Sequence, residues 1–319
     1  MCCDIPVGRR LFLYNTVCEI ILHDYTGDAG AVLDACEMTA RHVQDMLNAY
    51  DPESELGRMN RLHRPGVPYA VSAELYTLLR RMDRFSARCQ GAYDATVRPL
   101  VELWDFTAPQ PAIPSRRAIR AAMERCGYSR VRYDDGTQTL TFSEPGMSID
   151  AGGVGKGYAA GCVAECLHHA GIRSASINFG GELYLLGAYP SAEGSDLWPV
   201  AVQKPGAARG VKAGRILLAQ DLAVASSGSY DRFFRIDGET YCHILDPRTG
   251  WPVPAGMESV TVVCGDPVLA ELLSTAIFVL GREDGAALAL AHGAQCLFAD
   301  SNGEICITEL PQPLFRTAN

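Results

Sequence analysis

Lys156 lies in a glycine-rich stretch whose composition suits the binding of a phosphate. The stretch SIDAGGVGKGYAAG, residues 148–161, holds five glycines and Lys156 within fourteen positions. Glycine has no Cβ atom, so a glycine-rich backbone can point its N–H groups at an anion. The stretch leads from a predicted strand into a predicted helix near Gly157, whose free N–H groups would add to an anion site. A tight turn whose glycines serve only close packing would give the same pattern.

The two common phosphate-binding turns do not fit this stretch. A P-loop needs Gly, four residues and then Gly-Lys-Ser/Thr, but Gly157 follows the lysine and Asp150 stands at the first glycine position. A Rossmann turn needs G-x-G-x-x-G, and Tyr158 stands at its third glycine. Any phosphate chemistry must therefore use another design.

Glu271 and Thr275 are candidates for a metal site. They lie four residues apart in the apolar segment LAELLSTAIFVLG, so both oxygens project from one face of a predicted helix. A carboxylate and a hydroxyl are hard oxygen ligands that suit Mg²⁺, which keeps few protein ligands and often binds substrate phosphates. The alternative is an ordinary helix in which the Thr275 hydroxyl bonds back to a backbone carbonyl.

His243 is the candidate general base. It ends a predicted strand in YCHILDPRTGWPV and runs into the turn residues Asp246-Pro247-Arg248-Thr249-Gly250. Histidine is the side chain best suited to take a proton near neutral pH. A core histidine with satisfied hydrogen bonds is the alternative.

Two further small-residue turns predict close approach of the backbone to a large polar ligand. Gly180 and Gly181 end one predicted strand, with Asn178 and Glu182 beside them, and the other turn is Ser226-Ser227-Gly228-Ser229. Each turn taken alone is also compatible with an ordinary β-turn.

The elements that must position these residues alternate between hairpins and helices. Turn pairs at Asp135-Gly136, Asp237-Gly238 and Asn302-Gly303 predict three hairpins. The pattern predicts a strand over 11–23, strand pairs over 175–187 and 199–218, and helices over 30–50, from Ser72, 115–126, 157–170 and 267–280. This arrangement predicts an α+β fold with largely antiparallel sheets.

The composition narrows the class of protein. The 319 residues are 48% hydrophobic and 20% charged, as in globular domains, and a net charge of −9 disfavours nonspecific binding of nucleic acid. The sequence lacks an apolar run for a membrane span and the pattern of a signal peptide, so we expect a cytoplasmic protein. An exported or membrane-anchored protein whose leader was removed is the alternative. The 12 cysteines are scattered without a C-x-x-C pair, which favours buried thiols over a metal or redox centre.

Seven segments in order resemble the ApbE family of FAD:protein FMN transferases, over nearly the whole chain. They are YDPESELGRMN with Ser54, Glu55 and Asn60; GAYDATVRPLVELWDF with Tyr93, Asp94, Thr96, Pro99, Leu100 and Trp104; DAGGVGKGYA; INFGGELYLLG; SSGSYDRFF; HILDPRTGWPV; and AELLSTAIFVLG. The chain departs from the family pattern at Glu271, where Asp is usual, at Gly155, where Ala is usual, at Arg98, where Gly is usual, and at Tyr14-Asn15-Thr16, where Met-Gly-Thr is usual.

The resemblance implies a T-fold-like α+β architecture in one domain over residues 1–319, with two closely packed subdomains as the alternative. It implies Mg²⁺ held by Glu271, Thr275 and the Gly155 carbonyl, with His243 as general base. FMN would pass from FAD to a Ser/Thr hydroxyl of a target protein, releasing AMP, and the target would carry a motif like Asp-Ser/Thr-Gly-Ala-Ser/Thr. The residues expected to contact FAD are Tyr14, Asn60, Tyr93, Asp94, Thr96, Lys156, Asn178, Gly180, Gly181, Glu182, Ser227, Gly228, His243 and Arg248.

Three other functions remain open at this stage. A Mg²⁺-dependent FAD pyrophosphatase, which releases FMN and AMP because water replaces the protein hydroxyl, would use the same residues. A flavin-binding protein without turnover would not need His243, Glu271 and Thr275 together. A cysteine-based metal or redox protein would carry bound iron or zinc.

Overall fold

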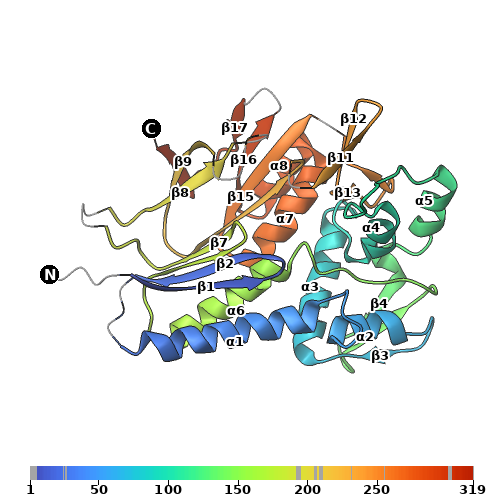
Figure 1. The fold of residues 1–319 in the computed structure, drawn as a ribbon, viewed down its shortest axis with the longest axis horizontal. Helices are drawn as coiled ribbons and strands as arrows, with labels where there is room; N and C mark the ends of the chain where they lie inside the picture. Colours follow the sequence, from blue (N-terminus) through green and yellow to red (C-terminus); the bar gives the residue numbers. More distant parts are fainter. Residues whose placement is uncertain are drawn as a thin grey trace.

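An eight-stranded antiparallel sheet forms the centre of the protein (Figure 1). The structure is a computed structural model, and it describes residues 6–318 apart from 24, 26, 192–194, 205–206, 208–210, 231, 255 and 301–303. The sheet order is β1-β2-β6-β7-β10-β15-β16-β17. Its strands are β1 (Val7–Leu13), β2 (Thr16–Leu22), β6 (Ala175–Phe179), β7 (Glu182–Leu186), β10 (Leu222–Gly228), β15 (Met257–Cys264), β16 (Gln295–Asp300) and β17 (Ile305–Ile307).

The first two strands correct one sequence prediction. The single strand expected over 11–23 is wrong, because β1 and β2 form a hairpin in which Leu13 pairs with Thr16. Tyr14 and Asn15 make the turn with φ values of 51° and 56°. Two-residue hairpin turns need positive φ at both positions, and a tyrosine at the first gives no turn signal in the sequence.

Helices cover one face of this sheet. They are α1 (Ala29–Leu47), α6 (Gly155–His169), α7 (Pro267–Leu280) and α8 (Arg282–Ala291), and α1 runs beside α6 beneath the β1–β2 hairpin (Figure 1). The prediction of α7 is confirmed: Asp266 caps its first N–H groups, and Gly281 at φ 82° ends it. The predicted helices over 30–50 and 157–170 are confirmed within two or three residues. The helices seal the larger core against the sheet.

The opposite face packs on a small second sheet. Its strands are β8 (Trp198–Gln203), β9 (Lys212–Leu218) and β18 (Phe315–Ala318), in the order β18-β9-β8. Trp198, Ile216 and Phe315 pack on Leu185 and Val263 of the large sheet. This second core lies on the side of the sheet away from α6 and α7.

A mainly helical segment lies beside the sheet and carries the loop of residues 93–96. It contains α2 (Glu55–Leu62), β3 (Tyr69–Ala70), α3 (Ala73–Arg88), the short helix Ala95–Val97, α4 (Arg98–Trp104), α5 (Arg116–Met123), the short helix Tyr128–Arg130, β4 (Val131–Asp134) and β5 (Thr139–Phe142). Ser72 and Ser115 cap α3 and α5 as predicted, and the β4–β5 hairpin is confirmed. The sequence patterns gave no prediction of α2, α4 or α8.

An aromatic cluster joins α4 to the C-terminal hairpins β11 (Phe233–Ile236), β12 (Glu239–Cys242), β13 (Leu245–Asp246) and β14 (Trp251–Pro252). Trp104 stacks on Phe106, Phe234 and Tyr241, and its indole N–H donates a 2.9 Å hydrogen bond to the carbonyl of Gly250. The β11–β12 hairpin at Asp237-Gly238 is confirmed. The predicted turn at Asn302-Gly303 lies outside the described residues.

The fold class follows from these pairings. Every strand pairing in the described chain is antiparallel, so the α+β prediction with antiparallel sheets is confirmed. Among the described helices, none is both long enough and apolar enough to cross a membrane.

Candidate active site

Lys156, Glu182 and Glu271 form a charged cluster where α6, β7 and α7 meet. The Lys156 Nζ lies 2.8 Å from Glu271 Oε1 and 3.3 Å from Glu182 Oε1. Both carboxylates are largely removed from water, with side-chain exposures of 4% for Glu271 and 13% for Glu182. Charges in such a position must be paired, and Lys156 forms an ion pair with both carboxylates.

The close approach of α6 and α7 depends on Gly157. Its backbone N–H donates a 2.7 Å hydrogen bond to Glu271 Oε2. A Cβ at Gly157 would lie 2.3 Å from the Pro267 carbonyl oxygen, so only glycine fits. Lys156 and Gly157 sit in the first turn of α6, whose N–H groups lack helical partners. Close packing therefore accounts for one glycine of the stretch, while the same turn presents a helix N-terminus.

The cluster shifts the pKa of two of its members. Burial alone would lower the pKa of Lys156, but Glu271 and Glu182 outweigh it and raise the pKa above its usual value. Burial raises the pKa of Glu182 to about 7, because desolvation and the nearby Glu271 outweigh the opposing effect of Lys156. Lys156 therefore stays charged at neutral pH, whereas part of Glu182 is protonated there.

Tyr93, Gly153 and Thr275 converge beside this cluster. A Cβ built on Gly153 would lie 3.5 Å from the Tyr93 ring and 3.6 Å from Thr275 Oγ1. The Tyr93 hydroxyl is buried and makes no hydrogen bond to the described residues, and the same holds for Glu182 Oε2. Burial, followed by the charges of Asp150 and Glu271, raises the pKa of Tyr93 well above its usual value. Buried polar atoms without protein partners are typical of a place where a ligand or a water molecule binds.

Ser227 on β10 reaches the same helix. Its hydroxyl donates a 3.0 Å hydrogen bond to Ser274 Oγ, and Ser274 in turn donates to the Glu271 carbonyl. A Cβ at Gly228 would lie 2.7 Å from the Tyr230 ring, so this glycine permits the chain to pass close to that ring. Residues 226–228 are therefore the end of strand β10 and not the turn expected there, and Ser227 fixes this strand to the helix that carries Glu271 and Thr275.

The donors around Glu271 fit a magnesium ion. The described chain holds no group of three or more His, Cys, Asp or Glu side chains suited to a metal, so a metal here would need mixed donors. Glu271 and Thr275 offer a carboxylate and a hydroxyl, and Gly155, the first residue of α6, has a carbonyl with two lone pairs. These hard oxygens match Mg²⁺. The Lys156 ammonium on Glu271 already shows that this carboxylate accepts positive charge.

His243 follows β12, and a backbone carbonyl orients its ring. His243 Nδ1 lies 3.2 Å from the Arg232 carbonyl, and its own backbone N–H donates to the same oxygen. A carbonyl can only accept, so the neutral ring carries its proton on Nδ1 and its lone pair on Nε2.

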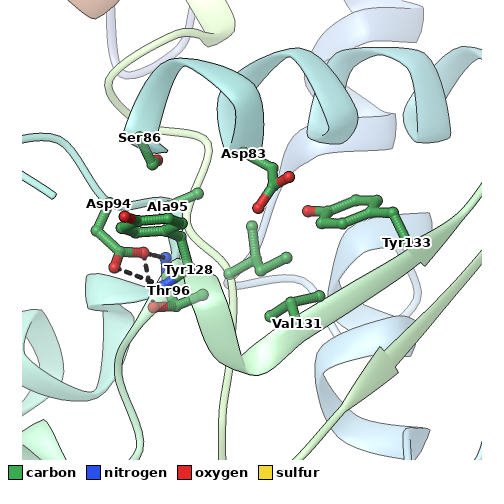
Figure 2. Close-up of a pocket in the computed structure, with 9 residues that line it drawn as sticks. Asp83, Ser86, Asp94, Ala95, Thr96, Tyr128, Val131 and Tyr133 are labelled. Carbon is green, nitrogen blue, oxygen red and sulfur yellow. Dashed lines mark hydrogen bonds between the residues drawn. The ribbon is translucent and has the colours of Figure 1, made fainter. Parts of the chain in front are cut away.

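Asp94 and Thr96, expected to contact FAD, hold their own loop together. Asp94 Oδ1 accepts hydrogen bonds from the N–H and the hydroxyl of Thr96, and Oδ2 accepts from the Tyr128 N–H at 2.7 Å. Figure 2 shows both side chains at a small cavity that Asp83 and Tyr133 face from α3 and β4. The cavity holds about 10 Å³, roughly the room for one water. These residues shape the loop next to Tyr93.

Asn60 and Tyr14 are also engaged by the chain itself. The Asn60 amide both donates to and accepts from the backbone of Ile149, at 2.8 Å each, and so fixes the start of the glycine stretch. The Tyr14 hydroxyl donates to the Ala40 carbonyl at 2.6 Å, and the ring stacks on Phe179. Tyr14 thus attaches the β1–β2 turn to α1.

The turn after β6 is shaped by its own residues. Asn178 Oδ1 accepts a hydrogen bond from the Gly181 N–H at 2.9 Å. Gly180 has a φ of 71°, and a Cβ there would lie 2.5 Å from the Thr16 side chain. The turn packs against the β1–β2 hairpin and presents Glu182 to Lys156.

Arg248 forms a two-pronged ion pair with Asp246. Its Nε and Nη2 lie 2.9 and 3.0 Å from the two carboxylate oxygens. The side chain is 40% exposed, so this pair is accessible to solvent. It sits in the turn between β13 and β14, in the same segment as His243.

Sequence reasoning did not assign roles to three residues that shape this region. Asp150 Oδ1 accepts from the Gly152 N–H, and Gln44 Oε1 accepts from the Tyr14 N–H at 2.8 Å. Arg98 on α4 lies over the Tyr50 ring at 4.6 Å and donates a hydrogen bond to the Ala49 carbonyl, so it attaches α4 to the loop between α1 and α2. Two of the three gave a signal in the sequence, Asp150 at the start of the glycine stretch and Arg98 where the family pattern has Gly.

Comparisons with known proteins identify the family. The ApbE family model matches residues 14–298. The FAD:protein FMN transferase of Vibrio cholerae is 34% identical over 253 residues, 78% of this chain and 73% of the relative. That of Klebsiella pneumoniae is 30% identical over 311 residues, 96% and 94% of the two chains.

Solved structures agree with this assignment and confirm the ApbE-like architecture. The ApbE protein from Thermotoga maritima superposes with a TM-score of 0.85 at 30% identity, covering 96% of this chain and 97% of the other. The flavin transferase ApbE from Vibrio cholerae gives 0.83 at 29% identity, covering 95% and 96%. The chain therefore belongs to the ApbE family.

Proposed function

We propose that this protein transfers the FMN half of FAD to a serine or threonine hydroxyl of a target protein, with Mg²⁺ at Glu271 and His243 as general base. That the chain is a flavin transferase follows from its family and from the enzyme name its curated relatives share. The proposal adds the metal, the base, the phosphoester product and the release of AMP.

One observation carries the proposal: a lysine and two buried carboxylates meet at the N-terminus of α6. FAD contains a pyrophosphate, whose negative charge repels nucleophiles. The Lys156 ammonium can bind these phosphate oxygens, and the positive end of the α6 helix dipole can offset charge that develops during attack. A bound Mg²⁺ would supply further charge neutralisation and orient the two phosphates.

We propose that Mg²⁺ is held by Glu271, Thr275 and the Gly155 carbonyl. Supporting this, Thr275 and Glu271 share one face of α7, and the unpartnered Tyr93 hydroxyl lies nearby. The ion would complete a site whose protein charges are two carboxylates and one ammonium.

The transfer replaces a phosphorus–oxygen bond of the FAD pyrophosphate with a phosphoester bond to the target protein. The target hydroxyl oxygen attacks the phosphorus of the FMN half, and the bond from that phosphorus to the bridging oxygen breaks. The bridging oxygen leaves with AMP, and the hydroxyl proton passes to His243 Nε2. The Arg232 carbonyl supports this role because it fixes the tautomer with the lone pair on Nε2.

The remaining expected FAD contacts divide into two groups under this proposal. Some would touch FAD directly through backbone or side-chain groups: Tyr93, Lys156, Gly181, Glu182, Ser227, Gly228 and Arg248. Others hold the loops that line its site through the hydrogen bonds and packing described above: Tyr14, Asn60, Asp94, Thr96, Asn178 and Gly180.

The experiment incubates the full chain with FAD, Mg²⁺ and a domain bearing an Asp-Ser/Thr-Gly-Ala-Ser/Thr motif. Mass spectrometry should find one FMN per target, with an equal amount of AMP. AMP without modified target would make the protein an FAD pyrophosphatase, and bound FAD without AMP would make it a flavin-binding protein.

The base is tested with His243→Ala. Removing a general base costs about 10²–10⁴-fold, so we expect transfer to fall by at least about 100-fold while FAD still binds. His42→Ala, which removes an exposed histidine paired with Glu74 on the helical side, should leave the rate unchanged. Unchanged transfer by His243→Ala would exclude it as the base.

A further inference from the structure

We propose that Lys156 is an internal cation that occupies Glu271 in the absence of metal and moves to Glu182 when a metal binds. This inference rests on the proposed function, since it takes Glu271 as the metal ligand. It assigns Glu182 a role as a positioning residue that holds the displaced ammonium.

The Lys156 ammonium and a bound metal would compete for the same oxygen of Glu271. Glu271 Oε2 is bound by the Gly157 N–H at 2.7 Å, and Oε1 faces Lys156 Nζ at 2.8 Å. A metal bound at Oε1 would meet the ammonium at close range, and like charges repel strongly where water is scarce. The metal and the ammonium therefore cannot both bind Glu271 Oε1.

Glu182 can receive the displaced ammonium. Its Oε1 already lies 3.3 Å from Nζ, a longer contact than that to Glu271. Its Oε2 is buried and makes no hydrogen bond to the described residues. A short movement of Nζ toward Glu182 would therefore gain an unused acceptor while it releases Glu271 Oε1.

The carboxylates of Glu182 and Glu271 are both fixed in position. The Gly157 N–H holds Glu271 on α7, and Glu182 begins β7 within the sheet. The flexible lysine side chain is the part of the cluster that can move without disturbing the backbone. The arrangement would keep the two buried acids neutralised with or without metal.

The test measures binding of Mn²⁺ alone to the full chain, without FAD, by electron paramagnetic resonance of the free ion. Lys156→Met should raise the affinity about 10-fold or more, because it removes the competitor. Glu182→Gln should lower it about 10-fold, because the ammonium loses its second partner. In the Lys156→Met background, Glu182→Gln should change the affinity less than about 3-fold.

A direct effect of the Glu182 charge on the metal would lower the affinity as much in the Lys156→Met background as in the wild type, whereas an effect through Lys156 disappears there, and the double-mutant cycle measures this difference. Additive effects would overturn the proposal. Lys212→Met, which removes a lysine of β9 outside this cluster, should leave the affinity unchanged.

A second measurement needs no variant. In a crystal structure of the wild-type protein soaked with Mn²⁺, Lys156 Nζ should contact Glu182 and no longer Glu271. Bound metal with Nζ still on Glu271 would refute the exchange alone. Absence of Mn²⁺ binding by the wild type at millimolar concentration would instead refute the proposed metal site, and the exchange with it.

Discussion

The Gly157 N–H donates a hydrogen bond to the carboxylate of Glu271, 114 residues later in the chain, at 2.7 Å. This bond joins the first turn of α6 to α7. It therefore fixes the position of the buried Glu271 carboxylate relative to the N-terminus of α6. A helix start normally leaves its N–H groups to water or to a ligand. Here the Gly157 N–H orients Glu271, the proposed metal ligand, and the neighbouring Lys156 neutralises the charge of that carboxylate.

Gly157→Ala should destabilise the protein. The new Cβ would lie 2.3 Å from the Pro267 carbonyl oxygen and 3.0 Å from Glu271 Oε2, so α6 and α7 must separate. Overpacking of this kind costs about 1–3 kcal/mol or more. We expect urea denaturation to show a loss of about 3 kcal/mol and Mn²⁺ binding to weaken.

Gly155→Ala is the matched control, since both glycines lie in the first turn of α6. A Cβ there would meet only Leu47 Cδ1, at 3.7 Å. Alanine is favoured over glycine in helices by up to about 1 kcal/mol. The free energy of unfolding should therefore stay equal or rise slightly, and equal damage from both changes would contradict the packing argument.

Asp94→Asn should destabilise the loop of residues 93–96. An asparagine at this position would turn its NH₂ toward the Tyr128 N–H or toward the two Thr96 donors, leaving a buried donor without an acceptor. Such a loss costs about 1–3 kcal/mol, and thermal unfolding monitored by circular dichroism should detect it.

The matched control for this loop is Asp134→Asn. Asp134 Oδ1 also accepts two backbone N–H groups, from Gly136 and Thr137, but in an exposed hairpin turn. Water can replace its second oxygen's partners, so we expect a change under about 0.5 kcal/mol. A larger loss at Asp134 than at Asp94 would mean that burial does not set the cost.

The sequence predicted elements best where local signals define both ends. α7 is an example, with Asp266 and Pro267 at its start and Gly281 after its end. The β1–β2 turn was missed because Tyr14 adopts positive φ, which long-range contacts with Ala40 and Phe179 stabilise. Local patterns cannot report such contacts.

The same limit applies to the candidate site. The pattern suggested Lys156 and Glu271 separately, from a glycine-rich turn and from helical spacing. Their pairing joins residues 115 positions apart, and neither residue type nor spacing predicts it. The partners of Asn60 and Asp94 are likewise set by tertiary structure, so the sequence, which suggested direct FAD contact for both, could not indicate the loop-holding role proposed for them.

Trp104→Phe should slow FMN transfer. The indole lies under the β13–β14 segment, donates to the Gly250 carbonyl and packs edge-on against Trp251, so its loss would let the His243 segment shift. Misplacing a catalytic group by about 1 Å can cost up to about 100-fold. We expect AMP release to fall at least about 10-fold at a temperature where the variant is folded.

Trp198→Phe provides the comparison for Trp104. Its indole also donates to a glycine carbonyl, that of Gly187 at 2.7 Å, but it packs in the second core on the opposite face of the sheet. Both variants should lose about 1–3 kcal/mol of stability. Only the Trp104 variant should lose activity, and equal losses of activity would show a general effect of destabilisation.

Glu182→Gln should change how stability depends on pH. Burial raises the pKa of Glu182 from 4.5 to about 7, so between these values the folded protein keeps a proton that the unfolded chain releases. Stability then falls as pH rises through this window, because the folded state binds more protons there. The glutamine resembles the protonated acid and removes the dependence.

Wild type and Glu182→Gln should therefore have similar free energies of unfolding near pH 5. Near pH 8 the variant should be more stable by about 1–3 kcal/mol, as the size of the shift implies. Urea denaturation at a series of pH values measures this difference, with Glu239→Gln in the exposed β11–β12 hairpin as a control that should follow the wild type. A difference that stays constant from pH 5 to 8 would show that Glu182 is not protonated in the folded protein. The free-energy cost of burying the Glu182 carboxylate would then be fully offset by the charge of Lys156.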